Sequence, residues 1–288
     1  MAISFSRIIP LLSLVIVGAL SSACSDVNFS AVQKDSGSPG ANPLTNPPAT
    51  CTDVESIYRQ TKILFLVDAS GSNVQTTANQ GSNGCGTHYC TPPTDPQKEF
   101  RGGAIGDFFR RYRHKTNFDW SFAVFQGTSA FSLIQGGNNQ NPVFASKPTP
   151  MGYAIQDFYG IEDKGATPYK AALALAKRAV QADPDLNAPS KPNYFIILLT
   201  DGFPTDYYDQ NGSYDSQALS RDVDSLLGVA PGQVSLSTIY YGQFNDPNAI
   251  TLLRGMASKG SGQFASVNDP NSGFRIDDII PGTQPNCR

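Results

Sequence analysis

The chain has 288 residues, of which 40% are hydrophobic and 16% are charged, and its formal net charge is -3. This length suits one large α/β domain or two small ones, and the composition is that of a globular protein. The lack of a basic excess argues against a nucleic-acid-binding protein, and the lack of an acidic run argues against a solvating tail. Abundant Gly, Pro, Asn and Ser are expected for an exported protein with long polar loops.

Residues 1–23 predict a secretory signal peptide. Arg7 precedes an apolar run from Ile8 to Leu20, which is followed by small residues and then by Cys24. A positive charge, an apolar core and small residues in this order are typical of such a signal. The run has about 13 residues, whereas a helix that spans a bilayer needs roughly 20.

The position of Cys24 resembles the lipobox of bacterial lipoproteins, in which the cysteine is lipidated and becomes the new N-terminus. That family prefers a branched apolar residue three positions before the cysteine, where this chain has Ser21. An ordinary signal peptide with an incidental cysteine is the alternative, and we favour lipidation. Ser25 resembles the residue that follows the cysteine in lipoproteins of the outer membrane. The resemblance implies a lipid-anchored protein of the bacterial cell envelope, at the periplasmic face or the cell surface.

Residues 24–50 predict a flexible tether. The stretch is rich in Ser, Gly, Pro and Asn and has almost no apolar residues. Such a segment cannot bury enough apolar surface to offset the entropy lost on ordering. It would hold a folded domain, expected at residues 51–288, away from the membrane.

The remaining cysteines are Cys51, Cys85, Cys90 and Cys287. An even number in an exported chain predicts disulfides, and three pairings are possible. Cys51 and Cys287 flank the predicted domain, and we expect them to pair because domain termini often lie close together. Cys85 and Cys90 would then close a small loop. Zinc binding by Cys85, His88 and Cys90 is a weaker alternative, because a structural zinc site needs four ligands.

Strands and helices are expected to alternate along the rest of the chain. Short apolar runs predict strands that are buried on both faces of a parallel sheet. The expected strands are Lys62–Asp68, Trp120–Phe125, Ser129–Ile134, Asn193–Asp201, Val234–Tyr241 and Gln263–Val267. Amphipathic patterns and capping signals predict helices. The expected helices are Lys98–Arg113, Pro168–Ala182, Ser216–Leu227 and Pro247–Ser258.

This order predicts an α/β fold with three layers, in which an open, mostly parallel sheet has helices on both faces. Ser129–Ile134 follows the preceding strand within a few residues. It is therefore expected to pair with that strand as an antiparallel edge hairpin.

Oxygen-bearing side chains stand where two of the long strands end. Asp68 ends the first strand and is followed by Ser70 and Ser72, Asp201 ends another, and Thr167 stands where a helix should begin. In open sheets of this kind, ligands bind at the carboxyl ends of the strands. Three separate segments are therefore expected to bring oxygen ligands to one edge of the sheet.

The string Asp-x-Ser-x-Ser, then Gly-Ala-Thr-Pro at 165–168, then Thr-Asp-Gly at 200–202, resembles the metal-ion-dependent adhesion site of von Willebrand factor A domains. The resemblance covers nearly everything from Lys62 to Val267 and implies a Rossmann-like fold of that family. The residues that match the family's five metal ligands are Asp68, Ser70, Ser72, Thr167 and Asp201.

Three hydroxyls and two carboxylates suit a hard cation that keeps a coordination position open. Mg²⁺ prefers six oxygen ligands and seldom receives all of them from protein. The resemblance therefore implies a module, not an enzyme, that binds a protein ligand by accepting its Asp or Glu on Mg²⁺, or on Mn²⁺ or Ca²⁺. Each residue also has an ordinary explanation, since Ser70 and Ser72 could form a turn, Thr167 an N-cap, and Asp201 a turn with the following glycine.

Two nearby segments are expected to shape the binding face. Residues 73–97 form a long polar loop that resembles an insertion, because the family enters its first helix sooner; a neutral surface loop is the alternative. Tyr207 and Tyr208 follow Asp201 and would be good contact residues if they are exposed. They could instead pack under a loop.

Two alternative functions remain. A structural component of an envelope assembly could use the fold without metal-dependent binding. A serine hydrolase is disfavoured, because the chain has only His88 and His114 and no Gly-x-Ser-x-Gly elbow follows a strand. We expect contact with the membrane through the lipid anchor alone, and no nucleic-acid partner.

Overall fold

The computed structural model describes residues 59–74, 77–78, 90–136, 141–209, 211–242, 246–267 and 274–280. The predicted signal peptide and tether lie outside these ranges, as do Cys24, Cys51, Cys85 and Cys287, and only the backbone of Cys90 is described. Within the described ranges, no helix has the length and apolar character needed to cross a membrane.

A six-stranded sheet in the order β10-β9-β8-β1-β4-β5 forms the middle layer. Its strands are β1 (Thr61–Asp68), β4 (Phe118–Gln126), β5 (Ser129–Ser132), β8 (Asn193–Thr200), β9 (Val234–Tyr240) and β10 (Ser261–Ser266). Neighbouring strands are parallel except β4 and β5, which are antiparallel. The prediction of a mostly parallel sheet with one antiparallel edge hairpin is confirmed.

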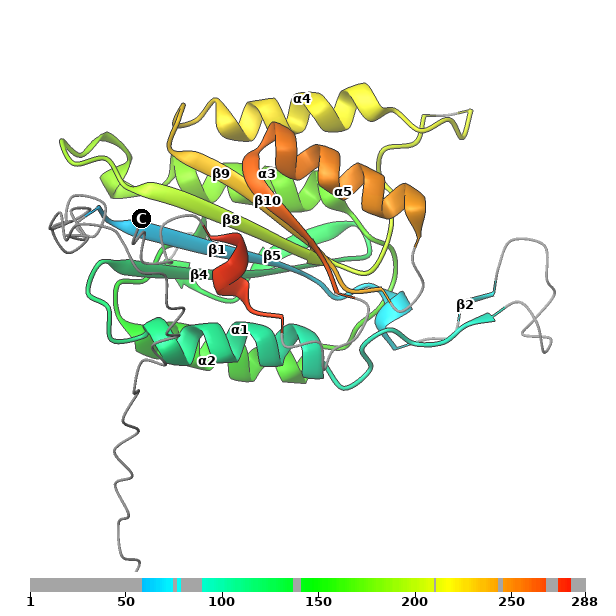
Figure 1. Ribbon diagram of the computed structural model, residues 1–288, viewed down its shortest axis with the longest axis horizontal. Helices are drawn as coiled ribbons and strands as arrows, with labels where there is room; N and C mark the ends of the chain where they lie inside the picture. Colours follow the sequence, from blue (N-terminus) through cyan, green and yellow to red (C-terminus); the bar gives the residue numbers. More distant parts are fainter. Residues whose placement is uncertain are drawn as a thin grey trace, which may run out of the picture. The chain divides into compact units, whose positions relative to one another are not determined.

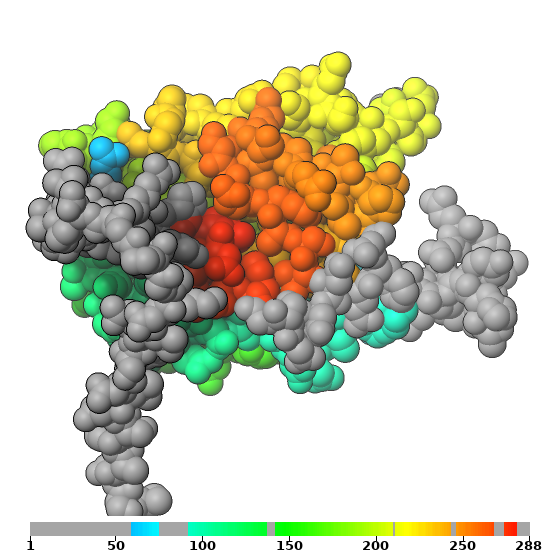
Figure 2. All heavy atoms as spheres, viewed as in Figure 1, coloured from blue at the N-terminus to red at the C-terminus, as the bar shows by residue number. Residues whose placement is uncertain are grey.

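Helices cover both faces of this sheet (Figure 1). The helices α1 (Glu99–Tyr112) and α2 (Pro148–Gly160) lie on one face, and α3 (Tyr169–Gln181), α4 (Ser216–Leu227) and α5 (Pro247–Lys259) lie on the other. The short helix η5 (Ile276–Ile279) packs against β10 and α1. The space-filling view shows η5, in red, beside the orange segments of α5 and β10 (Figure 2). The predicted three-layer α/β fold is therefore confirmed.

The remaining elements are short. They are η2 (Gly71–Asn73), η4 (Pro184–Asn187), and the two-residue strands β2 (Thr77–Ala78), β3 (Cys90–Thr91), β6 (Gln135–Gly136) and β7 (Asn141–Pro142). The strands β2 and β3 pair with each other, and so do β6 and β7.

The unbroken apolar run of β1 is explained by its central place in the sheet. Ile63, Phe65 and Val67 belong to the core cluster that contains α1 and α2, whereas Leu64 and Leu66 belong to the cluster that contains α3 and α4. All of these side chains are fully buried. Because the strand faces two cores, it is apolar at every position from Ile63 to Val67 and ends at Asp68.

The strand register places the predicted metal ligands at one edge. Val67 pairs with Leu199 of β8, and Asp68 pairs with Phe125 of β4. Because β1, β4 and β8 are parallel, Asp68 and the residues that follow Leu199 meet at the carboxyl edge of the sheet. This is the edge at which ligands bind in open α/β sheets.

Two expectations about helices need correction. The helix expected from Pro168 begins at Tyr169, with Pro168 at the cap position, so Thr167 is not its N-cap. Helix α2 (Pro148–Gly160) was not expected at all. Its two prolines lie in the first turn, where a missing N–H breaks no helical hydrogen bond.

Candidate metal site

The loop after β1 is fixed by backbone hydrogen bonds to two other segments. Ala69 N donates to Phe125 O (2.9 Å), and Gly71 N donates to Gly165 O (2.9 Å). Gly165 has a φ of +71°, and a Cβ there would lie 2.8 Å from the Cα of Gly127. Only glycine fits this close approach without strain. The segment before Thr167 is therefore held against the loop that carries Ser70 and Ser72.

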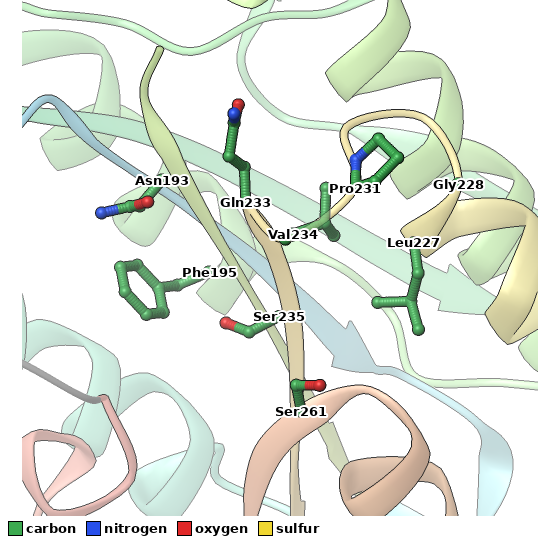
Figure 3. Close-up of a pocket in the computed structure, with 10 residues that line it drawn as sticks. Asn193, Phe195, Leu227, Gly228, Pro231, Gln233, Val234, Ser235 and Ser261 are labelled. Carbon is green, nitrogen blue, oxygen red and sulfur yellow. The ribbon is translucent and has the colours of Figure 1, made fainter. Parts of the chain in front are cut away.

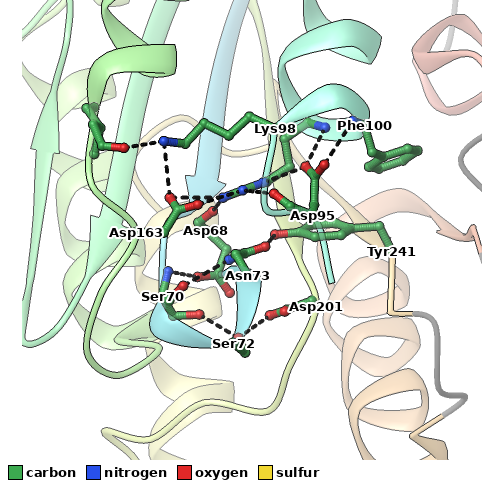
Figure 4. Close-up of polar contacts among 12 residues, drawn as sticks. Asp68, Ser70, Ser72, Asn73, Asp95, Lys98, Phe100, Asp163, Asp201 and Tyr241 are labelled. Atoms are coloured by element: carbon green, nitrogen blue, oxygen red, sulfur yellow. Dashed lines mark hydrogen bonds and ion pairs between the residues drawn. The ribbon is translucent and has the colours of Figure 1, made fainter. Parts of the chain in front are cut away.

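Four of the five predicted ligands are joined by hydrogen bonds (Figure 4). Ser70 N donates to Asp68 Oδ1 (2.7 Å), and the hydroxyls of Ser70 and Ser72 lie 3.0 Å apart. Ser72 Oγ donates to Asp201 Oδ1 (2.9 Å). Asp68 and Ser70 are 0% and 1% exposed. Residues that are 129 positions apart in the sequence thus share one buried polar cluster.

Thr167 lies in the segment that borders this cluster. Its side chain is buried, its N–H donates to Thr205 Oγ1 (3.1 Å), and its carbonyl accepts from Thr205 N (3.0 Å). In the part of the chain that the structure describes, no hydrogen bond joins the Thr167 hydroxyl to the other four predicted ligands. Its role as a ligand stays a prediction.

Thr200 and Tyr169 connect Asp68 to the end of β8 and the start of α3 through hydrogen bonds. Thr200 Oγ1 donates to Asp68 Oδ2 (2.6 Å). Tyr169 OH donates to Gly202 O (2.6 Å) and lies 3.2 Å from Thr200 Oγ1. Neither residue was predicted from the sequence to have a role in the site. Thr200 precedes Asp201 in the Thr-Asp-Gly string, and that position was a signal that could have been used.

Both carboxyl groups of the cluster are hard to ionise. Burial, and then the nearby charge of Asp201, raise the pKa of Asp68 to about 7. Burial also raises the pKa of Asp201, against hydrogen bonds from Thr94 and Ser72 that lower it. Asp201 Oδ2 is buried and has no hydrogen-bond partner among the described residues. A buried carboxylate oxygen without a partner is costly unless something else compensates its charge.

A divalent cation fits this set of donors. Carboxylate and hydroxyl oxygens are the ligands of hard cations such as Mg²⁺. Within the described ranges, no group of three or more His, Cys, Asp or Glu side chains is positioned to hold a metal. A site at Asp68 and Asp201 would therefore depend on the hydroxyls of Ser70 and Ser72 for its other oxygens.

The guanidinium of Arg101, which is fully buried, joins three segments next to the cluster. Its Nη1 donates to the carbonyl oxygen of Asp68 (2.5 Å), its Nε to Asp95 Oδ2 (2.9 Å), and its Nη2 to Asp163 Oδ2 (2.8 Å). These contacts join the end of β1, the entry to α1 and the segment that leads to Thr167. This network was not predicted from the sequence.

Both ends of the predicted insertion at residues 73–97 lie beside the cluster. Thr94 N donates to Ser72 O and Asp95 N donates to Asn73 O, both at 3.2 Å. The Asn73 side chain accepts a hydrogen bond from Tyr241 OH (2.9 Å). Residues 75–76 and 79–89 lie outside the described ranges. The insertion therefore starts and ends at the carboxyl edge, and its contact with a partner stays a prediction.

The two tyrosines proposed as partner contacts differ in exposure. Tyr207 is 2% exposed and its hydroxyl donates to Asp222 Oδ2 (2.7 Å). The expectation that it is exposed for a partner is wrong, because it packs under the loop. Tyr208 is 50% exposed and lines a groove of about 770 Å³ with Phe203 and Tyr214. Tyr208 stays a candidate contact.

A separate groove of about 690 Å³ lies at the amino ends of β8 and β9 (Figure 3). Its labelled lining residues are Asn193, Phe195, Leu227, Gly228, Pro231, Gln233, Val234, Ser235 and Ser261. None of them carries a charge or an imidazole that could activate a nucleophile. This groove is at the edge of the sheet opposite Asp68, so it has no part in the candidate metal site.

No protein-family model matches the chain, and no curated protein matches its sequence. Among solved structures it is similar to a mutant of the PilB minor pilin from Streptococcus sanguinis, at 14% identity and a TM-score of 0.48 over 74% of this chain and 58% of that chain. It is also similar to the pilus adhesin SpaC from Lactobacillus rhamnosus GG, at 13% identity and a TM-score of 0.49 over 74% of this chain and 29% of that chain. A third similar structure is the vWF domain of the type V pili tip protein Mfa5 from Porphyromonas gingivalis, at 10% identity and a TM-score of 0.46 over 73% of this chain and 90% of that chain. The chain thus spans 58% and 29% of the first two proteins, and the similarity concerns the fold alone.

Proposed function

We propose that the chain is a binding module of the bacterial cell envelope that recognises a partner protein through a divalent cation. Asp68, Ser70, Ser72, Thr167 and Asp201 would hold the cation, with Mg²⁺ preferred over Mn²⁺ and Ca²⁺. The observation that carries this proposal is the buried oxygen of Asp201 without a hydrogen-bond partner, next to a second buried carboxyl group whose pKa is raised. When bound, the cation supplies positive charge and an open coordination position for an Asp or Glu of the partner.

Some residues of the site supply charge for the cation, and others hold the oxygen ligands in place. Asp68 and Asp201 supply two negative charges, which a divalent cation balances, and the serine hydroxyls add oxygen atoms without adding charge. The hydrogen bonds of Ser70 and Ser72 keep their hydroxyls close to the carboxylates. Arg101 holds the carbonyl of Asp68 and so fixes the end of β1. A site held in this way needs little reorganisation when a ligand binds.

The metal requirement is tested with the mature chain and two aspartate variants. We expect isothermal titration with Mg²⁺ to show binding to the wild type and at least a tenfold weaker affinity for Asp68→Ala. The control is Asp157→Asn, which changes an exposed carboxylate on α2 and should bind Mg²⁺ like the wild type. Equal Mg²⁺ affinity of all three proteins contradicts the proposed site.

The partner is sought by capture from the native envelope in Mg²⁺, followed by elution with a chelator. We expect an envelope protein to elute from the wild type and from Asp157→Asn, but not from Asp68→Ala. A partner that stays bound in EDTA and is captured equally by Asp68→Ala would favour the structural alternative, in which the fold works without metal-dependent binding. Thermal unfolding of each variant shows whether it is folded.

We also propose that Cys24 carries a lipid that anchors the protein, at the outer membrane. The test is the mass of the N-terminal peptide of protein that detergent releases from the envelope. We expect acyl chains on Cys24 and no residue before it. A mature chain that begins elsewhere and carries no lipid contradicts the anchor without affecting the metal site.

A further inference from the structure

The end of α1 and its connection to β4 hold the densest cluster of basic residues in the sequence. Arg110 and Arg111 lie in the last turn of α1, and Arg113, His114 and Lys115 follow it, in a chain whose net charge is -3. All of them are exposed. The connection leads into the start of β4, which is parallel to β1, so it lies at the amino edge of the sheet. Figure 1 shows this edge opposite the end of β1 that carries Asp68.

Part of this charge is free to act on a ligand. Arg110 and Arg111 each form an ion pair with an aspartate. Arg113 and Lys115 form no ion pair with any described residue, and neither does Lys147, which precedes α2. The loop therefore presents uncompensated positive charge together with the start of α2.

A groove of about 510 Å³ lies beside these cations, between the end of α1 and the start of α2. Phe109, Arg113, His114 and Tyr153 contribute to its lining, and no acidic side chain does. Tyr153 is 63% exposed, more than the other large exposed hydrophobic residues, Tyr159 and Tyr208. A basic groove with an exposed tyrosine favours an anionic ligand that also offers an apolar or interfacial environment.

Acidic groups described at the same edge pair with cations of the protein, and on the α1 side Asp277 pairs with Arg111. Asp183 and Asp185 follow α3 and bind the buried ammonium group of Lys62 at 2.7 and 2.6 Å. They belong to the layer that contains α3, whereas the groove lies between α1 and α2. The negative charge of Asp183 and Asp185 is thus largely neutralised by Lys62, and it does not offset the cations between α1 and α2.

The polypeptide enters the domain next to these cations. Thr61 N donates to Asn117 O (2.7 Å), and the Asn117 side chain donates to Arg59 O (3.4 Å). Asn117 follows Lys115 closely in the sequence. The described part of the chain therefore begins at the basic edge. If the predicted tether of residues 24–50 is a flexible Gly- and Ser-rich linker, its root-mean-square length is roughly 30 Å, short enough to keep this edge near the bilayer.

We propose that Arg113, His114, Lys115, Lys147 and Tyr153 form a membrane-contact surface that rests on anionic lipid headgroups. Basic side chains near an anionic leaflet are attracted to it, and tyrosine is favoured at the boundary between membrane and water. The expected position of the membrane rests on the proposed lipid anchor, whereas the charge and the groove do not. Contact here would turn the carboxyl edge, with Asp68 and Asp201, away from the membrane and toward a partner.

The test measures sedimentation of the unlipidated mature chain, Cys24→Ser, with vesicles. We expect binding to vesicles that contain phosphatidylglycerol, weak binding to pure phosphatidylcholine, and loss of binding at high salt. Replacing Arg113, Lys115 and Lys147 with Gln should lower the partition coefficient by on the order of 100-fold, because each cation near an anionic surface contributes about fivefold. The Tyr153→Ala variant should lower it by a smaller factor.

The matched control replaces Lys170, Arg178 and Arg221 with Gln. It removes the same charge from exposed positions on α3 and α4 and should leave most of the binding intact. Equal losses in the two triple variants, or equal binding to both kinds of vesicle, would overturn the proposal. The Asp68→Ala variant and EDTA should leave vesicle binding unchanged; loss of binding in either case would assign it to the metal site. Failure of the metal proposal is thus separable from failure of this one.

Discussion

At the scale of single residues, the candidate site depends on Asp68 and Asp201 being close together in a buried place. Burial and the charge of Asp201 raise the pKa of Asp68 to about 7, whereas an aspartate in an unfolded chain has a pKa near ~3.9. The folded metal-free protein therefore binds more protons than the unfolded chain between these values. This contribution to stability is present at low pH and is lost as the pH rises through the folded pKa.

We expect the metal-free protein to become less stable between about pH 5 and 8, by on the order of 3 kcal/mol. The stabilisation of the protein by Mg²⁺ should instead increase with pH, because the carboxylates must lose their protons before they bind a cation. The increase in Tm caused by Mg²⁺ should therefore be larger at pH 8 than at pH 5. Thermal unfolding in EDTA and in Mg²⁺ at both pH values measures this difference.

The control for this prediction is Asp68→Asn, which cannot ionise at that position. In EDTA its Tm should depend less on pH than the wild-type Tm does, and Mg²⁺ should change it little. Other titrating groups affect both proteins alike, so the comparison isolates the carboxyl group of Asp68. An effect of Mg²⁺ that is the same at both pH values in the wild type would contradict the prediction.

Which site residues could be predicted depended on the kind of contact they make. Asp68, Ser70, Ser72 and Asp201 follow strand ends, and strand ends can be located from apolar runs. Thr200 is the last residue of β8, and whether its hydroxyl meets Asp68 depends on the register between β1 and β8. The sequence patterns placed both strands but did not determine that register. They predicted the edge of the sheet, but not which hydroxyls support it.

At the scale of elements, the strands and most helices could be predicted because each has a strong local pattern. The central strands β1 and β8 contain the unbroken apolar runs Ile63–Val67 and Tyr194–Leu199, as strands between two helical layers require. Helix α2 was missed because its sequence begins with Pro148 and Pro150 and contains Gly152 and Gly160, which are weak helix formers. Its helical form depends on packing of Met151 and other residues against the sheet. Tertiary packing can thus override a weak local preference.

Arg101 shows why the support of the site could not be predicted. Its partners Asp95 and Asp163 lie 6 and 62 residues away, and neither spacing is a helical or strand repeat. Only the fold brings the entry of α1 and the segment after α2 to the end of β1. A buried guanidinium with two carboxylates costs desolvation energy, so its value lies in holding these segments in one arrangement.

We expect Arg101→Met to lower the free energy of unfolding by about 3–5 kcal/mol, because it leaves the carboxylates of Asp95 and Asp163 buried without their partner. The affinity for Mg²⁺ should fall as well, since the carbonyl of Asp68 loses its donor. Urea unfolding and calorimetric titration measure the two effects. The matched control is Arg110→Met, whose exposed ion pair with Asp107 should contribute less than about 1 kcal/mol. Similar losses in the two variants would show that the buried network does not hold the site.

At the scale of the whole molecule, the two edges of the sheet have different chemistry. The carboxyl edge has the buried carboxyl groups and the ends of the predicted insertion, whereas the amino edge has the basic loop and the entry of the chain. The described C-terminal segment also reaches the amino edge, because Asp277 pairs with Arg111 and accepts a hydrogen bond from Tyr112 OH (2.5 Å). Both ends of the folded part are therefore near the end of α1.

The Cys51–Cys287 disulfide stays a prediction, because both cysteines lie outside the described residues. The segments from Cys51 to Arg59 and from Ile280 to Cys287 can each span at least ~20 Å when extended, so the two cysteines can meet. Closing such a long loop is worth up to roughly 5 kcal/mol in the chain-entropy model, whereas the short Cys85–Cys90 loop is worth about 2 kcal/mol. We therefore expect the pair that joins the two termini to stabilise the domain more.

The prediction is tested by mapping disulfides in peptides prepared without reductant, followed by urea unfolding of two double variants. Replacing Cys51 and Cys287 with Ser should lower the free energy of unfolding more than replacing Cys85 and Cys90 does. Free thiols at Cys51 and Cys287, or a peptide that joins either of them to Cys85 or Cys90, would show that the pairing is wrong. An equal loss in both variants would contradict the expected order of stabilisation, as happens when residual structure in the unfolded chain reduces the entropy that a long cross-link removes.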